Sequence, residues 1–153
     1  MKTRGKSGFS LIELIVTVMI ISILVGLALP MARNSIKRER EAALHQALRE
    51  MRVAIDKFKD ASDRGFIEVK LNTEGYPEKL EILVEGVPKL NAVDMKLRFL
   101  RKIPIDPMTN STDWGLRSYQ DEPESSSWGG ENVFDVYSKS TGTALDGTKY
   151  SEW

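Results

Sequence analysis

The chain has 153 residues, a length that fits one compact domain. Its 22 basic and 22 acidic side chains give a net charge of zero, so electrostatics does not favour a nucleic-acid-binding protein. The sequence has no cysteine and a single histidine, His45, which excludes disulfides, cysteine nucleophiles and multi-histidine metal clusters.

A basic segment followed by a long apolar run occupies the N-terminus. Three basic residues lie within residues 1–8, and no charged residue occurs from Leu14 to Ala32. The run approaches the roughly 20 residues that a helix needs to cross a bilayer, and the basic flank predicts a cytoplasmic start. Its end fits an ordinary signal-peptide cleavage site poorly. We therefore expect residues 9–32 to form a transmembrane helix.

Glu13 is an acidic residue just inside the apolar stretch. An unpaired carboxylate is costly in the hydrocarbon region of a bilayer. The side chain either reaches the headgroup layer or has a positively charged partner. The residue pattern alone leaves both interpretations open.

The segment Gly8-Phe9-Ser10-Leu11-Ile12-Glu13-Leu14 closely resembles the processing site of the type IV pilin superfamily. That superfamily includes type IV pilins and the pseudopilins of type II secretion and of competence systems. The resemblance implies that a membrane prepilin peptidase removes residues 1–8 by cutting after Gly8, and that the new N-terminus, Phe9, is N-methylated. It also implies that Glu13 pairs with the freed amine of an adjacent subunit during filament assembly.

Such a pair would offset the desolvation cost of both charges, so loss of Glu13 should impair assembly more than folding. Pro30 removes a backbone donor from the helical pattern, which predicts a kink or local melting between Gly26 and Pro30. The resemblance implies that this segment unwinds within the filament. A simple packing kink in a membrane anchor is the alternative.

Apolar residues continue at a helical period through residues 33–63. This stripe predicts that the amphipathic part of the helix packs against a C-terminal head. Asp63-Arg64-Gly65 should end the helix, which would then run about 80 Å from Phe9 to Ala61. His45 and the charged run 37–41 are expected at the surface, where the charged run either faces solvent or contacts another subunit. Five charged residues should likewise face water or other subunits: Arg49, Glu50, Arg52, Asp56 and Lys59.

The head, residues 64–153, shows short β-like segments and one short helix. A helix is expected over Tyr76–Val84, and Val133–Tyr137 alternates as a strand with Arg117–Tyr119 as a weaker partner. Residues 120–132 are expected to form a connecting loop. The sequence therefore predicts an α+β protein in which a long N-terminal helix packs against a small antiparallel sheet of about three strands. Together with the resemblance, this is a type IV pilin-like fold.

The segment from Leu97 to Pro107, with its Pro104-Ile105-Asp106-Pro107, resembles the part of major type II secretion pseudopilins that precedes the sheet. Val136-Tyr137-Ser138 and Trp153 resemble the end of the same group. The missing cysteine agrees with this, because many type IVa pilins close their C-terminal region with a disulfide.

The resemblance to major pseudopilins also implies a calcium-binding loop near the C-terminus. Asp146 is the one aspartate in place for it, since Gly142 lies near the position where another would be expected. Ser138 and Thr141 could add oxygen ligands, but one carboxylate makes a weak calcium site. A loop closed by hydroxyl groups and glycine turns is the alternative, so no cofactor is certain.

No catalytic motif is present, and the acidic residues of Asp106-Pro107 and Asp113-Trp114-Gly115 lie in turn contexts where aspartate caps backbone amides. We therefore expect a structural subunit rather than an enzyme. The resemblance implies that the subunit polymerises into a periplasmic pseudopilus that drives folded proteins across the outer membrane.

The implied partners are further copies, minor pseudopilins, the prepilin peptidase and an inner-membrane assembly platform with its ATPase. The implied location is the bacterial inner membrane, crossed once, with the head in the periplasm. A surface type IV pilin for adhesion, motility or DNA uptake is the alternative. A membrane-anchored periplasmic enzyme or binding domain is a third reading, in which no cut would occur after Gly8.

Overall fold

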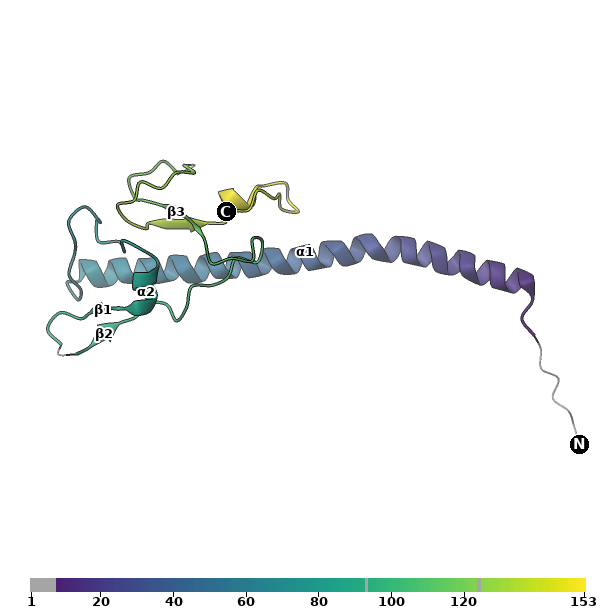
Figure 1. Ribbon diagram of the computed structural model, residues 1–153, viewed down its shortest axis with the longest axis horizontal. Coiled ribbons are helices and arrows are strands. Elements are labelled where there is room, and N and C mark those ends of the chain that lie inside the picture. Colours follow the sequence, from purple (N-terminus) through teal and green to yellow (C-terminus); the bar gives the residue numbers. More distant parts are fainter. Residues whose placement is uncertain (1–7, 93, 124) are drawn as a thin grey trace, which may run out of the picture. The chain divides into compact units, whose positions relative to one another are not determined.

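The structure is a computed structural model that describes residues 8–92, 94–123 and 125–153, with the backbone only for residues 27–33. The chain divides into two compact units, residues 1–38 and 39–153, and each is considered by itself. The ribbon in Figure 1 shows one long helix, two short strand pairs and a yellow C-terminal segment. The expected leader, residues 1–8, lies outside the described residues except for Gly8.

Helix α1 runs from Leu11 to Asp63, close to the predicted limits. Its assignment is unbroken across Gly26–Pro30, so the expected local melting is not seen in the single chain; the side chain of Pro30 lies outside the described residues. Among the described residues, no helical stretch combines the length and hydropathy needed to span a bilayer. The transmembrane segment expected over residues 9–32 is therefore not found by this criterion.

The predicted glycine stop ends α1. Gly65 has φ +69°, a left-handed conformation that glycine adopts without a Cβ penalty. The Gly65 N–H donates to the carbonyl of Ser62 at 2.9 Å, and the Phe66 N–H donates to the carbonyl of Ala61 at 2.9 Å. These two bonds form a Schellman motif, which satisfies carbonyl groups that the last helical turn leaves open.

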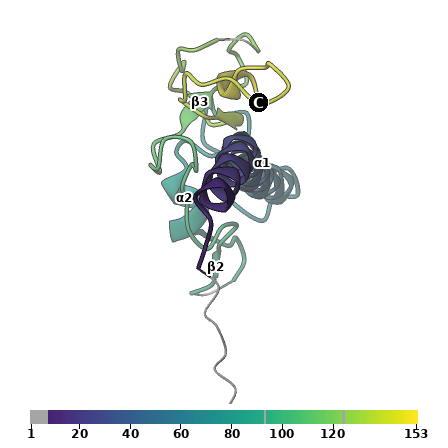
Figure 2. The same cartoon turned by 90° about the vertical axis from the view of Figure 1, so that its right-hand side faces the viewer.

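The head packs on the predicted apolar stripe of α1. All seven residues of that stripe are buried, and so is Ala61 one turn further on: Leu44, Ala47, Leu48, Met51, Ala54, Ile55 and Phe58. Leu83, Val133 and Val136 are among the residues that the rest of the head adds to this core. Around the part of α1 that belongs to the head, residues 39–63, β3 and the C-terminal segment lie on one side and β2 lies on another (Figure 2). The long helix is thus the base on which the head is assembled.

The remaining elements are short. They are α2 (Glu81–Glu85), β1 (Val87–Pro88), β2 (Lys96–Leu97), β3 (Gly115–Arg117), β4 (Asp135–Tyr137) and the 3-10 turn η1 (Tyr150–Glu152). β1 pairs antiparallel with β2, and β3 pairs antiparallel with β4 in the register that places Gly115 opposite Tyr137. The described residues therefore hold two two-stranded sheets, and the prediction of one sheet of about three strands was wrong.

Two boundary predictions need correction. The expected helix over Tyr76–Val84 is shortened to α2 because the Pro77 carbonyl accepts the Val133 N–H at 2.7 Å, which ties this stretch to the chain before β4. The strand partner of β4 is centred on Leu116, two residues before the centre of the predicted Arg117–Tyr119. The described part of the connecting loop 120–132 contains no helix or strand, as predicted.

Candidate functional site

The N-terminal segment places the expected processing site just before a helix. Gly8, Phe9 and Ser10 are exposed and precede α1, and the first helical bond joins the Leu14 N–H to the Ser10 carbonyl at 3.1 Å. A Cβ built on Gly8 meets no atom within 4 Å, and the Phe9 side chain is 77% exposed. The Gly8–Phe9 peptide bond is therefore uncrowded and lies outside regular secondary structure, which suits attack by a peptidase.

The first four turns of α1 present an apolar surface that none of the described residues covers. Every large apolar side chain from Leu11 to Val25 is exposed. The hydroxyls of Thr17 and Ser22 donate to the carbonyls of Leu14 and Val18 at 2.9 and 2.8 Å, so both are satisfied within the helix. A water-exposed helix surface of this kind is unfavourable for an isolated subunit and indicates burial by lipid or by other chains.

Glu13 lies in the first turn of α1 and is exposed within this apolar surface. It is the only acidic or basic residue between Gly8 and Gly26. Covering the surface would desolvate its carboxylate, and a cationic partner would offset that cost. The predicted site residues Gly8, Phe9 and Glu13 are thus gathered at one end of the helix.

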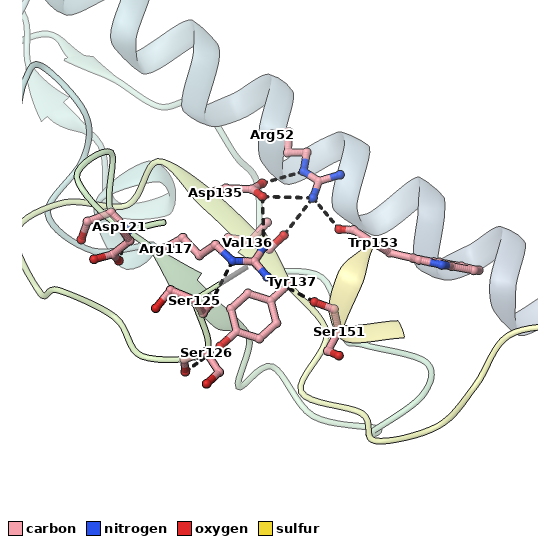
Figure 3. Close-up of polar contacts among 11 residues, drawn as sticks. Arg52, Arg117, Asp121, Ser125, Ser126, Asp135, Val136, Tyr137, Ser151 and Trp153 are labelled. Atoms are coloured by element: carbon pink, nitrogen blue, oxygen red, sulfur yellow. Dashed lines mark hydrogen bonds and ion pairs between the residues drawn. The ribbon is translucent and has the colours of Figure 1, made fainter. Parts of the chain in front are cut away.

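In the head, Arg52 joins α1 to β4 and to the last residue. Its Nε donates to Oδ1 of Asp135 at 2.7 Å, and its Nη2 donates to Oδ2 of Asp135 at 3.2 Å. Nη2 also donates to the carbonyl oxygen of Val136 at 3.2 Å and to that of Trp153 at 2.7 Å (Figure 3). The expectation that Arg52 faces water or other subunits was therefore wrong.

A second arginine lies on the other side of Asp135. Arg117 donates to the carbonyls of Ser125 and Ser151 at 3.1 and 3.2 Å, and its Nη1 lies 3.5 Å from Oδ2 of Asp135. Its guanidinium carbon lies 4.2 Å from the centre of the Tyr137 ring. Figure 3 shows the two arginines on either side of Asp135. We call Arg52, Asp135 and Arg117 the arginine clamp, because their contacts join α1, β3, β4 and the C-terminal segment.

Glu41 and His45, which precede Arg52 in α1, also contact the C-terminal segment. Oε1 of Glu41 accepts hydrogen bonds from the Leu145 N–H and the Tyr150 hydroxyl, each at 2.9 Å. Burial and this bond to Glu41 raise the pKa of the Tyr150 phenol to about 12. The ring of His45 stacks on that of Trp153 with centroids 4.0 Å apart. Glu41 was grouped with the charged run 37–41, and its role in holding the head was missed.

The expected calcium ligands take separate hydrogen-bond partners. Oδ1 of Asp146 accepts from the backbone N–H and the hydroxyl of Thr148 at 2.9 and 2.7 Å, and these bonds lower the pKa of the Asp146 carboxyl. The Ser138 hydroxyl donates to Oδ2 of Asp106 at 2.6 Å. Over the described ranges, no group of three or more potential metal-ligating side chains is found. Asp146 and Ser138 thus bond to different partners, and the calcium site with Thr141 stays a prediction.

The acidic residues of the turn motifs have structural partners. Asp106 is fully buried, and its Oδ1 accepts the Met108 N–H at 2.7 Å, which is the backbone capping expected of an Asp-Pro turn. Asp113 is exposed, and its Oδ1 lies 2.6 Å from Nζ of Lys139.

One family model matches the chain, the prokaryotic N-terminal methylation motif, over residues 3–29. This motif is typical of type IV pilin-like proteins and supports prepilin-peptidase processing and membrane anchoring. The α+β fold with its long N-terminal helix is consistent with a pilin-like fold, and the chain is thus similar to pilins and pseudopilins over its N-terminal segment. A search of curated proteins and a search of solved structures gave no match.

Proposed function

We propose that this protein is a non-enzymatic subunit that polymerises into the periplasmic pseudopilus of a type II secretion system. The observation that carries the proposal is the apolar surface of α1 from Leu11 to Val25, which is exposed along its whole length and holds one carboxylate, Glu13. A surface of that kind suits a helix that passes from lipid into a bundle of identical helices. The match to the methylation motif covers the same residues.

In this proposal a prepilin peptidase cuts between Gly8 and Phe9, and Phe9 is then N-methylated. The freed ammonium group of an incoming subunit pairs with Glu13 of its neighbour, which removes the cost of an isolated charge and fixes the axial register. The inner membrane anchors the unassembled subunit with its head in the periplasm. Minor pseudopilins, an assembly platform and its ATPase are the partners.

The segment of the head that contains Asp106 favours a pseudopilus over a surface pilus. The resemblance of Leu97–Pro107 to major pseudopilins includes Asp106, whose buried carboxylate accepts the Ser138 hydroxyl just after β4. This bond joins two segments that carry the resemblance. Closure of the head by hydrogen bonds also agrees with the absence of cysteine.

The test is a gene deletion complemented with the wild type, with Glu13→Ala or with Ser22→Ala. Ser22 is a matched control because it lies in the same helix and its hydroxyl bonds only to the Val18 carbonyl. Mass spectrometry of the medium and the periplasm should show a set of proteins retained in the periplasm in the deletion strain and in Glu13→Ala, with export restored by Ser22→Ala.

Unchanged export together with the loss of sheared surface fibres would instead identify a surface pilin. An intact Met1 in the purified protein, or normal assembly of Glu13→Ala, would refute a processed filament subunit of either kind.

A further inference from the structure

A small pocket lies between the C-terminal end of α1 and the segment that follows it. Phe58, Tyr76, Ile82 and Val87 supply apolar walls. Its volume is about 60 Å³. One ordered water needs roughly 10–15 Å³ by the same kind of measure, so the pocket has room for more than a single water molecule. All lining residues belong to the head.

Ser62 lines this pocket and has the one buried side-chain oxygen without a hydrogen-bond partner among the described residues. The residue is only 4% exposed. Its backbone carbonyl is used by the Gly65 N–H, but its hydroxyl is not used. Buried polar groups nearly always have a partner, and leaving one unsatisfied costs about 1–3 kcal/mol.

Gly75 keeps the space beside this hydroxyl open. It lines the pocket with φ +81°, and a Cβ built there would lie 2.8 Å from Oγ of Ser62. At the rim, Nζ of Lys70 lies 2.7 Å from Oε2 of Glu78, so these two charges neutralise each other. Glu68 also lines the pocket, which therefore combines apolar walls, one unsatisfied hydroxyl and a rim with one ion pair and a further carboxylate.

From this arrangement we propose that the pocket binds a small, uncharged, largely apolar molecule that carries one hydrogen-bonding group. The apolar part lies against Phe58, Ile82 and Val87, and the polar group pairs with the Ser62 hydroxyl. The apolar walls disfavour an ionic ligand, because burying a charge without a partner is costly. None of its residues lies on the exposed apolar surface of α1, so this proposal and the proposed function can be tested separately.

The test compares phenol with toluene, two rings of the same shape that differ in a hydroxyl and a methyl group. The full chain is placed in lipid nanodiscs with labelled isoleucine and valine methyl groups, and each probe is titrated while the Ile82 and Val87 signals are followed. Saturable shifts are expected in the millimolar range, as befits ligands of this size. The buried Val136 methyls serve as an internal reference and should not shift.

Ser62→Ala should weaken phenol binding about fivefold, the effect of one hydrogen bond, and should leave toluene binding unchanged or slightly tighter. Ser151→Ala is the matched control, since the contact described for Ser151 is made by its carbonyl oxygen, and it should alter neither probe. Val69→Trp, at an exposed rim position, should reduce the binding of both probes.

Partition of the probes into lipid lowers their free concentration equally for every variant, because the nanodiscs are identical. It therefore does not affect the comparison of affinities. Absence of saturable shifts in the wild type would overturn the proposal and leave a cavity that holds only water. Equal effects of Ser62→Ala on phenol and toluene would also overturn it, because the hydroxyl would then not be the polar contact.

Discussion

Replacing Arg52 by alanine tests whether the arginine clamp holds the head together. The change removes two bonds to Asp135, one to Val136 and one to Trp153. Charge-assisted bonds contribute about 1.5–3 kcal/mol each when buried. The Arg52 side chain is 40% exposed and that of Asp135 is 24% exposed, so solvent screening reduces the total. We expect the free energy of unfolding to fall by about 2 kcal/mol after this discount.

For a head of this size, that loss lowers the melting temperature by about 8 °C. Tryptophan fluorescence during heating of the full chain in nanodiscs measures the change. Lys139→Ala is the matched control, because its ion pair with Asp113 is largely exposed and contributes at most about 0.5 kcal/mol. Arg52→Lys keeps the charge but loses the two-pronged geometry, so it should fall between Arg52→Ala and wild type. The reasoning would be refuted if Arg52→Ala and Lys139→Ala had the same melting temperature.

Three further perturbations test other parts of the head. Ser138→Ala leaves the fully buried Oδ2 of Asp106 without its hydroxyl donor, and urea unfolding should show a loss of about 2 kcal/mol; an unchanged midpoint would contradict this. Gly115→Ala places a methyl group in steric overlap with the Tyr137 ring and should lower the free energy of unfolding by about 3 kcal/mol. The loss should be smaller in a Tyr137→Leu background. Because the pKa of Tyr150 is about 12 in the folded state against an ordinary 10, the unfolded chain loses this proton first, and stability should decline as pH rises from about 10 to 12. Absorbance at alkaline pH should show a tyrosine that titrates near pH 12, and Tyr150→Phe should remove that step.

The helical part of the fold could be predicted because its signals are local. The apolar stripe of α1 repeats every three to four residues, and the glycine that ends the helix is part of the same stretch. The strand β4 was also found from its alternation. In contrast, β1 and β2 have two residues each, which is too short for alternation to be seen.

The contacts of Arg52, Arg117 and Glu41 could not be predicted for a different reason. Their partners are distant in sequence: Arg52 bonds to residues 83 and 101 positions away, and Glu41 to a tyrosine 109 positions away. No spacing rule connects residues so far apart. The proposed processing residues Gly8 and Phe9 and the proposed assembly residue Glu13 lie in one short motif, which can be singled out from the sequence. The pocket at Ser62, in contrast, depends on a fold that brings Gly75 against the helix.

The residues of α1 that bond to the C-terminal segment are far from it in sequence. This separation determines the order in which contacts of the head can form. Glu41 and Arg52 are synthesised about a hundred residues before Leu145, Tyr150 and Trp153, their partners. Until those partners have been synthesised, Glu41 and Arg52 lack these native contacts. Contacts of such high sequence separation form slowly, since a long loop must close first. The head therefore gains these contacts only after residues 145–153 have left the ribosome.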